Sequence, residues 1–178
     1  MMVSLDGYFE MPNHDLSWHH VDTEFNEAFA IRQLEEIDTL LFGRKTYEMM
    51  ASFWPTDLAK DDPIVARLMN ETPKVVFSHT LDKTDWSNTT LVADGAAEEV
   101  SRLKNQPGKD IAIFGSNNLC VSLMQDDLVD EFRIMINPVV VGAGTRLFDG
   151  IKDKVEMKRT ANSREFKNGN VLLTYRVK

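Results

Sequence analysis

Three short apolar runs in the first two thirds of the chain each end in small or polar residues. The runs and the residues that follow them are Thr39–Phe42 before Gly43, Val75–Phe77 before Ser78, and Ile111–Phe114 before Gly115. Apolar runs of this length, bounded by turn residues and separated by segments with helical spacing, predict buried strands that alternate with helices. The carboxyl ends of parallel strands meet at one edge of a sheet, where ligands bind. The sequence therefore predicts an α/β fold whose ligand-binding edge includes these three strand ends.

Segments with apolar residues at helical spacing lie between the expected strands. Helices are expected from Asp22 or Thr23 to Ile37, from Arg44 to about Trp54, from Asp62 through Met69, from Gly95 to Asn105, and from Ser116 to Met124. Pro55 ends the second helix because proline disfavours helical backbone in the residue before it. On the third helix, Ile64, Val65, Leu68 and Met69 are expected on the buried side. The helices should cover both faces of the sheet.

The last part of the chain has a different pattern. Glu131–Asn137 alternates apolar and polar residues, which is typical of a strand. Val155–Phe166 and Asn170–Val177 are joined by Asn168-Gly169, a strong hairpin signal. Shorter strands are expected at Val3–Leu5 and Thr90–Val92. These patterns predict an α/β fold with a mixed, mostly parallel sheet and a C-terminal antiparallel hairpin.

The composition suits one globular domain that covers residues 1–178. A chain of 178 residues that is 43% hydrophobic can bury one substantial core. No apolar run approaches the roughly 20 residues of a membrane span, and the start lacks the basic and apolar regions of an export signal. A cytoplasmic protein is therefore expected. The single cysteine, Cys120, excludes an internal disulfide and a cysteine-based zinc site.

The net charge of −8 argues against a general nucleic-acid surface, because binding to phosphate backbones needs a basic stripe. An anionic ligand would need a local positive patch instead. The turn after Gly43 could supply one, since Arg44 and Lys45 stand where a helix begins and its unpaired N–H groups attract anions. An ordinary strand-to-helix turn with a solvated arginine is the alternative interpretation.

The loop from Met11 to His20 contains the cluster Trp18-His19-His20. Adjacent histidines point in different directions along an extended segment, and no third ligand stands at a suitable spacing. We therefore expect no metal site. Trp18 could either anchor the loop in the core or stack on a substrate.

A glycine-rich segment, Val139–Leu147, resembles the opening of a Rossmann dinucleotide fingerprint. That motif requires a third small residue and a following crossover helix, but Leu147 occupies the third small position and Gly150 ends the segment almost at once. Gly142 and Gly144 are instead expected to form a tight turn at the ligand edge of the sheet.

Four motifs in order resemble the dihydrofolate-reductase-like family, and most closely the reductase domain of the bacterial riboflavin-biosynthesis deaminase-reductase and its stand-alone relatives. The motifs are Ser4-Leu5-Asp6-Gly7, Gly43-Arg44-Lys45-Thr46-Tyr47, Phe114-Gly115-Ser116-Asn117-Asn118-Leu119 and Pro138-Val139-Val140-Val141-Gly142-Ala143-Gly144. The resemblance covers essentially the whole chain. It implies a three-layer α/β/α sandwich, NADPH as the hydride donor, a small-molecule substrate, and a homodimer.

The resemblance also implies positions for the site residues. Those expected at NADPH are Gly43, Arg44, Lys45, Thr46, Ser78, His79, Gly115, Ser116, Asn118 and Leu119, and those expected at the substrate are Ser4, Asp6, Gly7 and Trp18. Ser116 stands where the family usually has a second glycine. His79 replaces the usual arginine near the 2′-phosphate, which leaves the choice between NADPH and NADH open. Asp6 is the candidate catalytic residue, orienting the substrate or a water, or alternatively a residue that only forms an Asp-Gly turn.

The leading hypothesis from the sequence is an NADPH-dependent reductase of a small heterocycle, resembling 5-amino-6-(5-phosphoribosylamino)uracil reductase. One alternative is a pterin reductase of the dihydrofolate type, with Asp22 or Glu24 holding the pterin ring. The other is a non-catalytic, dimeric nucleotide-binding protein, suggested by the departures at Ser116 and His79.

Overall fold

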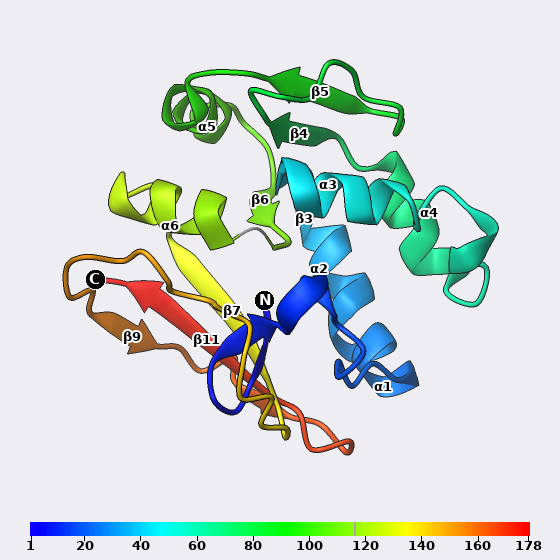
Figure 1. Cartoon of the computed structure of the whole chain (residues 1–178), viewed down its shortest axis with the longest axis vertical. Helices are drawn as coiled ribbons and strands as arrows, with labels where there is room; N and C mark the ends of the chain where they lie inside the picture. Colours follow the sequence, from blue (N-terminus) through cyan, green and yellow to red (C-terminus); the bar gives the residue numbers. More distant parts are fainter. Residues whose placement is uncertain (116) are drawn as a thin grey trace. The chain divides into compact units, whose positions relative to one another are not determined.

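The computed structural model describes residues 1–115 and 117–178 (Figure 1). These residues form two compact units. The first unit comprises Met1–Phe25 and Val121–Lys178, and the second unit comprises Asn26–Cys120. The prediction of one domain over residues 1–178 stays a prediction.

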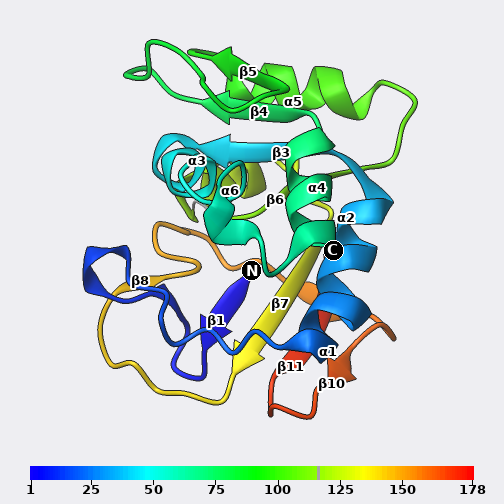
Figure 2. The same ribbon diagram turned by 90° about the vertical axis from the view of Figure 1, so that its right-hand side faces the viewer.

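A four-stranded parallel sheet organises the second unit (Figure 2). Its order is β5 (Thr89–Val92), β4 (Lys74–Phe77), β3 (Ile37–Gly43) and β6 (Asp110–Ile113). β3 is buried on both faces, since Leu40 and Phe42 on one face are 0% exposed and Leu41 on the other is 1% exposed. A strand buried on both faces explains why its sequence is a continuous apolar run rather than an alternating one.

Helices of the second unit pack on this sheet and on one another. They are α2 (Ile31–Glu36), α3 (Arg44–Ala51), α4 (Pro63–Glu71) and α5 (Ala96–Lys104), with a π-helical turn at Asn26–Ala30 before α2 and a 3-10 turn, η3, at Asp57–Ala59. Leu34, Tyr47 and Met69, one from each of three helices, join Leu40 and Phe42 in one apolar core. The expected helices are confirmed. The prediction that Ile64 is buried was wrong. Ile64 stands on the exposed side of the first turn of α4 and is 50% exposed.

An ammonium group lies inside this core. Lys74 is 1% exposed, and its Nζ donates to the carbonyl oxygens of Met69 at 2.8 Å, Asn70 at 3.1 Å and Thr72 at 2.6 Å. These carbonyls belong to the end of α4, so the lysine caps that helix from β4. The same Nζ lies 4.5 Å from the centre of the Trp86 ring. Trp86 Nε1 in turn donates to Asn70 Oδ1 at 2.7 Å.

The first unit is built around β7 (Glu131–Asn137). β1 (Met2–Ser4) pairs with it in parallel, and β11 (Val171–Val177) pairs with it antiparallel on the other side. The remaining strands are β9 (Met157–Arg159) and β10 (Arg164–Glu165), which both pair with β11, and β2 (Tyr8–Glu10), which pairs with β8 (Thr145–Arg146). This unit also holds a 3-10 turn, η1, at Pro12–His14 and a short helix α1 at Thr23–Phe25. α6 (Asn117–Gln125) continues from the second unit into the first.

The fold class expected from the sequence is confirmed, with parallel strands, helices and an antiparallel C-terminal hairpin. Asn168-Gly169 forms the turn, where Gly169 has φ +88° and its N–H donates to the Phe166 carbonyl at 3.0 Å. The expected long arm Val155–Phe166 is interrupted, and only β9 and β10 pair with β11. The described strands also form three separate hydrogen-bonded sheets. Periodicity identifies strand residues, whereas pairing depends on tertiary contacts.

None of the helices in the described part of the chain has the length and apolar character needed to cross a membrane.

Replacing Lys74 with methionine should lower the free energy of unfolding by about 3 kcal/mol, because the three carbonyl oxygens at the end of α4 lose their donor. Denaturation by urea would measure the loss. Lys83→Met is the matched control. Lys83 pairs with Asp85 at 3.1 Å but is 78% exposed, so this change should stay within about 0.5 kcal/mol of wild type. Equal, small losses for both variants would contradict the role assigned to Lys74.

The stability of wild type and that of Lys74→Met should depend differently on pH. Burial lowers the pKa of Lys74 to about 8 from the ordinary 10.5. Between these values the unfolded chain binds more protons than the folded chain, so the contribution of Lys74 to stability increases as the pH rises from about 8 to 10.5. The difference in stability between wild type and Lys74→Met should therefore shift in favour of wild type across this window.

Candidate functional site

The carboxyl ends of three parallel strands of the second unit lie side by side. The register pairs Gly43 of β3 with Phe77 of β4, and Leu41 of β3 with Ile113 of β6. The sequence prediction that these strand ends share one edge is confirmed. Such an edge, from which chain turns lead away, is the usual ligand-binding position in an open α/β sheet.

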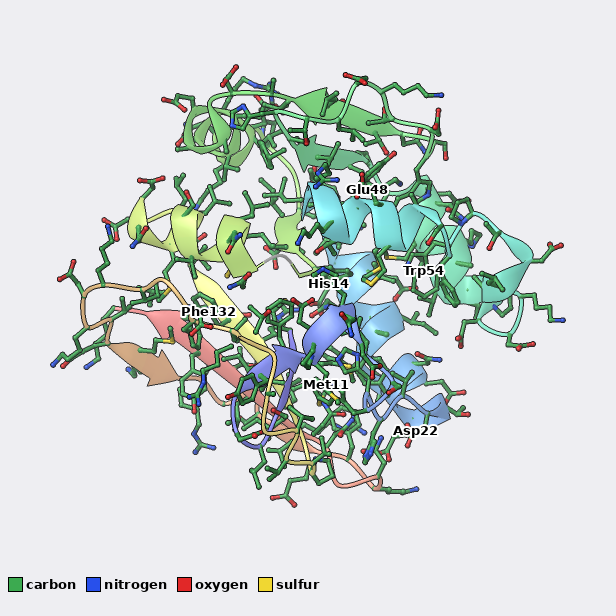
Figure 3. The ribbon with its side chains drawn as sticks, viewed as in Figure 1. Met11, His14, Asp22, Glu48, Trp54 and Phe132 are labelled. Carbon is green, nitrogen blue, oxygen red and sulfur yellow. The ribbon has the colours of Figure 1, made fainter. Side chains whose placement is uncertain are left out.

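The N-terminus of α3 opens at this edge. Gly43 is its N-cap, no side chain caps the helix, and no acidic residue stands in its first turn. Arg44 Nη1 lies 3.1 Å from Oε1 of Glu48, one turn further along α3. Glu48 is labelled on this helix in Figure 3. This ion pair is worth only a few tenths of a kcal/mol, roughly, because both side chains are about half exposed. The Arg44 side chain can therefore leave Glu48 for an anionic ligand with little loss of free energy. The positive end of the helix dipole would attract the same ligand.

Gly115, which follows β6, lies next to Thr46 of α3. Its φ is +91°, a left-handed conformation that favours glycine. A Cβ atom at this position would lie 3.3 Å from Cγ2 of Thr46 and 3.7 Å from its Oγ1. The backbone of Gly115 thus lies close to the Thr46 side chain. Because glycine has no side chain, a ligand can approach the backbone of this turn.

The turn after β4 is built by Ser78. Its side chain is 8% exposed, and its Oγ accepts hydrogen bonds from the N–H groups of Thr80 at 3.2 Å and Leu81 at 3.0 Å. His79 points to solvent, with Nδ1 3.3 Å from Asp94 Oδ1 and both side chains more than 70% exposed. A carboxylate beside the imidazole competes with any phosphate for it, which weakens His79 as a phosphate ligand.

Two further predicted cofactor residues, Asn118 and Leu119, stand in the first turn of α6. Asn118 is exposed and Leu119 is 8% exposed, so Leu119 is a core residue whose side chain faces inward. Lys45 is exposed in the first turn of α3. Ser116 lies outside the residues that the structure describes.

The predicted substrate residues belong to the first unit, where Asp6 follows β1. Its Oδ1 accepts from the Ser4 hydroxyl at 2.6 Å and from Val141 N–H at 3.2 Å, and its Oδ2 accepts from Gly142 N–H at 2.8 Å. The Ser4 hydrogen bond, followed by those of the two backbone amides, lowers the pKa of Asp6 below its ordinary value. The carboxylate is therefore ionised at neutral pH and joins the turn after β1 to the turn after β7.

The two glycines of the false Rossmann motif make this junction. Gly142 has φ +76° where it donates to Asp6. Gly144 has φ +137°, and a Cβ atom there would overlap the carbonyl group of Glu10 and Cα of Met11. The segment therefore needs glycine to pass close to the end of β2. The two glycines take positive φ where the chain bends, and their placement in a tight turn at the ligand edge stays a prediction. The sequence pattern did not reveal that this segment binds the Asp6 carboxylate.

Replacing Asp6 with asparagine should lower the melting temperature at pH 7, because an amide cannot accept from three donors as a carboxylate does. The contribution of Asp6 should be complete above the unfolded pKa of 3.8 and disappear as the pH falls through the lower folded pKa. Thermal scans from pH 7 down to pH 2.5 would test this. Asp82→Asn, at an exposed position, should follow wild type throughout, and a variant of Asp6 that did the same would contradict the assignment.

Trp18, the other predicted substrate residue outside the turn after β1, lies in the loop from Met11 to His20. Trp18 is 8% exposed and its ring meets that of His19 edge to face, with centroids 4.4 Å apart. His20 is exposed, but its N–H donates to Asn137 Oδ1 at 2.8 Å. Asn137 ends β7, so the segment is fixed at the carboxyl end of the parallel pair β1 and β7. Among the described residues, no group of three or more His, Cys, Asp or Glu side chains could hold a metal ion.

Both carboxylates considered for a pterin ring already have structural partners. Asp22 Oδ1 accepts from Phe25 N–H at 2.8 Å and caps the helix, as one of the two sequence alternatives predicted. Glu24 binds Arg164 at 3.2 Å and Lys167 N–H at 3.0 Å. No observation in this region favours a pterin site.

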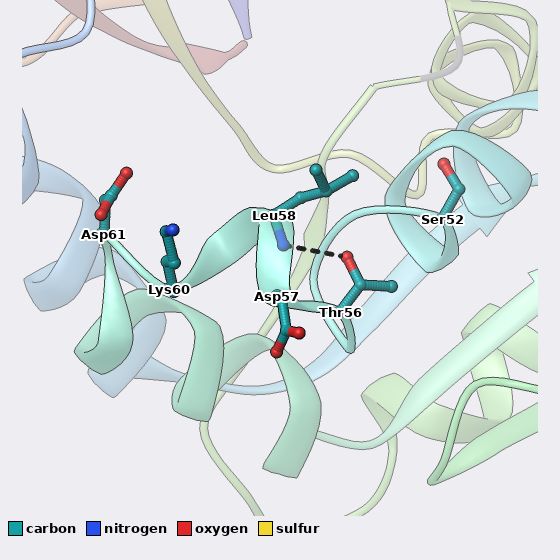
Figure 4. A pocket seen from close by; sticks show the side chains of 6 residues that line it. All are labelled: Ser52, Thr56, Asp57, Leu58, Lys60 and Asp61. Carbon is teal, nitrogen blue, oxygen red and sulfur yellow. Dashed lines mark hydrogen bonds between the residues drawn. The ribbon is translucent and has the colours of Figure 1, made fainter.

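Figure 4 shows a surface depression of the second unit. It is lined by Ser52, Thr56, Asp57, Leu58, Lys60 and Asp61, which follow α3. All six are exposed, and Thr56 Oγ1 accepts from Leu58 N–H at 3.3 Å to form a local turn. None of the residues predicted for cofactor or substrate lines it.

The parallel sheet with its strand-end site, followed by antiparallel C-terminal strands, defines a dihydrofolate-reductase-like fold. The family model of the RibD C-terminal domain matches residues 1–172. The chain therefore belongs to the RibD C-terminal domain family. The uncharacterized protein YyaP of Bacillus subtilis (strain 168) is 34% identical over 176 residues, which are 98% of this chain and 91% of YyaP.

Solved structures confirm the fold. A provisionally named riboflavin biosynthesis protein from Shewanella sp. PV-4 matches with a TM-score of 0.77 at 22% identity, covering 100% of this chain and 96% of that one. The diaminohydroxyphosphoribosylaminopyrimidine deaminase/5-amino-6-(5-phosphoribosylamino)uracil reductase of Thermotoga maritima matches with a TM-score of 0.70 at 16% identity. There the match covers 99% of this chain and 55% of the larger protein.

Proposed function

We propose that this protein is an NADPH-dependent reductase of a small heterocyclic substrate, similar in reaction to 5-amino-6-(5-phosphoribosylamino)uracil reductase. Membership of the RibD C-terminal domain family supports a reductase of this kind. The observation that carries the proposal is the edge of the parallel sheet in the second unit. There an uncapped helix N-terminus, a basic pair and a left-handed glycine turn stand together.

The residues at this edge fit a dinucleotide phosphate. The N–H groups at the start of α3, which no side chain caps, and the guanidinium of Arg44 would bind the phosphate oxygens. Gly115 would let the cofactor backbone approach where a Cβ would fill the space beside Thr46. NADPH would supply the hydride, and the chain would bind and orient it. In the first unit, Ser4, Asp6, Gly7 and Trp18 are proposed to bind the acceptor.

The proposal predicts tight binding of NADPH that depends on Arg44. Arg44→Ala should weaken binding by about 1.5–3 kcal/mol, the scale of a charged hydrogen bond, when the dissociation constant is measured by fluorescence titration. Arg67→Ala is the matched control, because Arg67 makes the same kind of exposed pair with Glu71 on α4, at 2.8 Å. The affinity of Arg67→Ala for NADPH should equal that of wild type. Failure of wild type to bind either NADPH or NADH would refute the proposal.

NADH should be titrated in parallel. His79 already lies beside Asp94, so little of any preference for the 2′-phosphate should come from this side chain, and His79→Ala should change the NADPH to NADH ratio by less than about threefold, under 1 kcal/mol.

A non-catalytic nucleotide-binding protein is the second candidate. The state of the Asp6 carboxylate favours it, since three protein donors already occupy the candidate catalytic group. Tight NADPH binding without oxidation of the cofactor by any aminopyrimidine acceptor would support this reading. Cofactor oxidation that is lost in Asp6→Asn, in a variant that remains folded, would exclude it.

We also propose a cytoplasmic homodimer. Sedimentation velocity at micromolar concentration should then give about twice the 20.3 kDa mass of the chain, and a single monomeric species would contradict it.

A further inference from the structure

Two helices of the second unit begin at the carboxyl edge of the parallel sheet, and their starts carry opposite charge. The first turn of α3, after β3, holds no acidic residue and begins with Arg44 and Lys45. The first turn of α5, after β5, holds Glu98 and Glu99. Asp94 adds a further carboxylate just before that helix. The side-chain charge along the edge therefore changes from basic after β3 to acidic after β5.

The turns after β4 and β5 lie side by side at this edge. The register pairs Phe77 of β4 with Val92 of β5, and the Ser78 N–H donates to the Val92 carbonyl at 3.0 Å. This pairing brings the next side chains together, so that His79 Nδ1 lies 3.3 Å from Asp94 Oδ1. The two side chains are 75% and 88% exposed, respectively. Both are therefore accessible to a ligand that lies across the ends of β4 and β5.

A dinucleotide bound at this edge is long enough to reach these turns. Neighbouring strands of a sheet are about 4.8 Å apart, so the ends of β3 and β5, with β4 between them, are about 10 Å apart. In the proposed function, the cofactor phosphates bind at the start of α3. Gly115 follows β6, which pairs with β3 on the side away from β4. One nucleoside of the cofactor therefore extends toward Gly115, and the other extends toward His79 and Asp94.

Neither of the turns after β4 and β5 supplies a strong cation for a phosphate. Ser78–Leu81 and Ala93–Gly95 contain no lysine or arginine. The Ser78 Oγ already accepts from the N–H groups of Thr80 and Leu81, and the imidazole of His79 already faces Asp94. A phosphate at this place would therefore meet a carboxylate without a guanidinium or an ammonium group from either turn to offset it.

We propose that the adenosine ribose of the cofactor lies at the ends of β4 and β5, and that Asp94 determines the choice between NADPH and NADH there. The two cofactors differ only by the phosphate on the 2′-oxygen of this ribose. The Asp94 carboxylate repels that phosphate, whereas it accepts a hydrogen bond from the free 2′-hydroxyl of NADH. NADH therefore binds almost as tightly as NADPH. The inference rests on the proposed function for the presence of a nicotinamide cofactor.

The test compares the dissociation constants of NADPH and NADH, measured by fluorescence titration on the full chain. Wild type should bind the two cofactors within about tenfold of each other. Asp94→Asn should tighten NADPH binding about threefold, because the repulsion is removed. The same variant should keep the NADH affinity within about twofold of wild type, since the amide oxygen still accepts from the ribose hydroxyl. Asp94→Arg should tighten NADPH binding at least about tenfold, because attraction replaces repulsion.

Asp85→Asn is the matched control for the change in net charge. Asp85 is 79% exposed, lies on the connection between β4 and β5, and pairs with Lys83 at 3.1 Å. The affinities of this variant for NADPH and NADH should equal those of wild type. A wild-type preference for NADPH above about tenfold, or a ratio of dissociation constants that Asp94→Arg leaves unchanged, would overturn the role of Asp94.

Salt separates a direct effect of charge from a change in the fold. The gain in NADPH affinity of Asp94→Arg should shrink at about 1 M sodium chloride, where the Debye length is only about 3 Å. A gain that does not depend on salt would contradict the electrostatic role of Asp94.

The same titrations keep this inference and the proposed function distinct. If both cofactors bind and the ratio of their dissociation constants does not respond to Asp94→Arg, only the role of Asp94 is refuted. If the ratio responds but no acceptor oxidises the cofactor, the role of Asp94 stands and the reductase is refuted. If wild type binds neither cofactor, both are refuted.

Discussion

Burial of β3 on both faces is the constraint on which the second unit depends. A strand with no solvent-facing side can lie only in the interior of a sheet with packing on both faces, and parallel neighbours β4 and β6 are in register beside it. Once these three strands are parallel, their carboxyl ends must meet. The helix after β3 therefore begins at this edge, with Gly43 as its N-cap and no side chain capping it.

Polar groups complete each unit where apolar packing cannot. In the second unit, Lys74 ends α4 by donating to its last carbonyl groups from inside the core. In the first unit, Asp6 joins the turns after β1 and β7 by accepting from Ser4 and two backbone amides. Both are charged groups whose unpaired alternative would be costly, so they define the geometry of the backbone around them.

The same reasoning divides the candidate site residues by role. Gly115 and Gly144 are required by close approach and positive φ. Leu119 packs in the core, and the Ser78 hydroxyl accepts a hydrogen bond from the backbone of its own turn. Among the described candidate residues, Trp18 has a buried Nε1 without a hydrogen-bond partner, and no side chain caps the start of α3.

The sequence by itself determined the element order, the three strand ends and the Asn168-Gly169 hairpin, because hydrophobic period and turn chemistry are local properties. It also carried the family resemblance. Only the tertiary structure decided that Gly142 binds Asp6, that Lys74 is buried under Trp86, and that Trp18 and His19 keep unpaired polar atoms. These facts join residues up to 136 positions apart, and no local pattern specifies which distant backbone amide or carbonyl a side chain will meet.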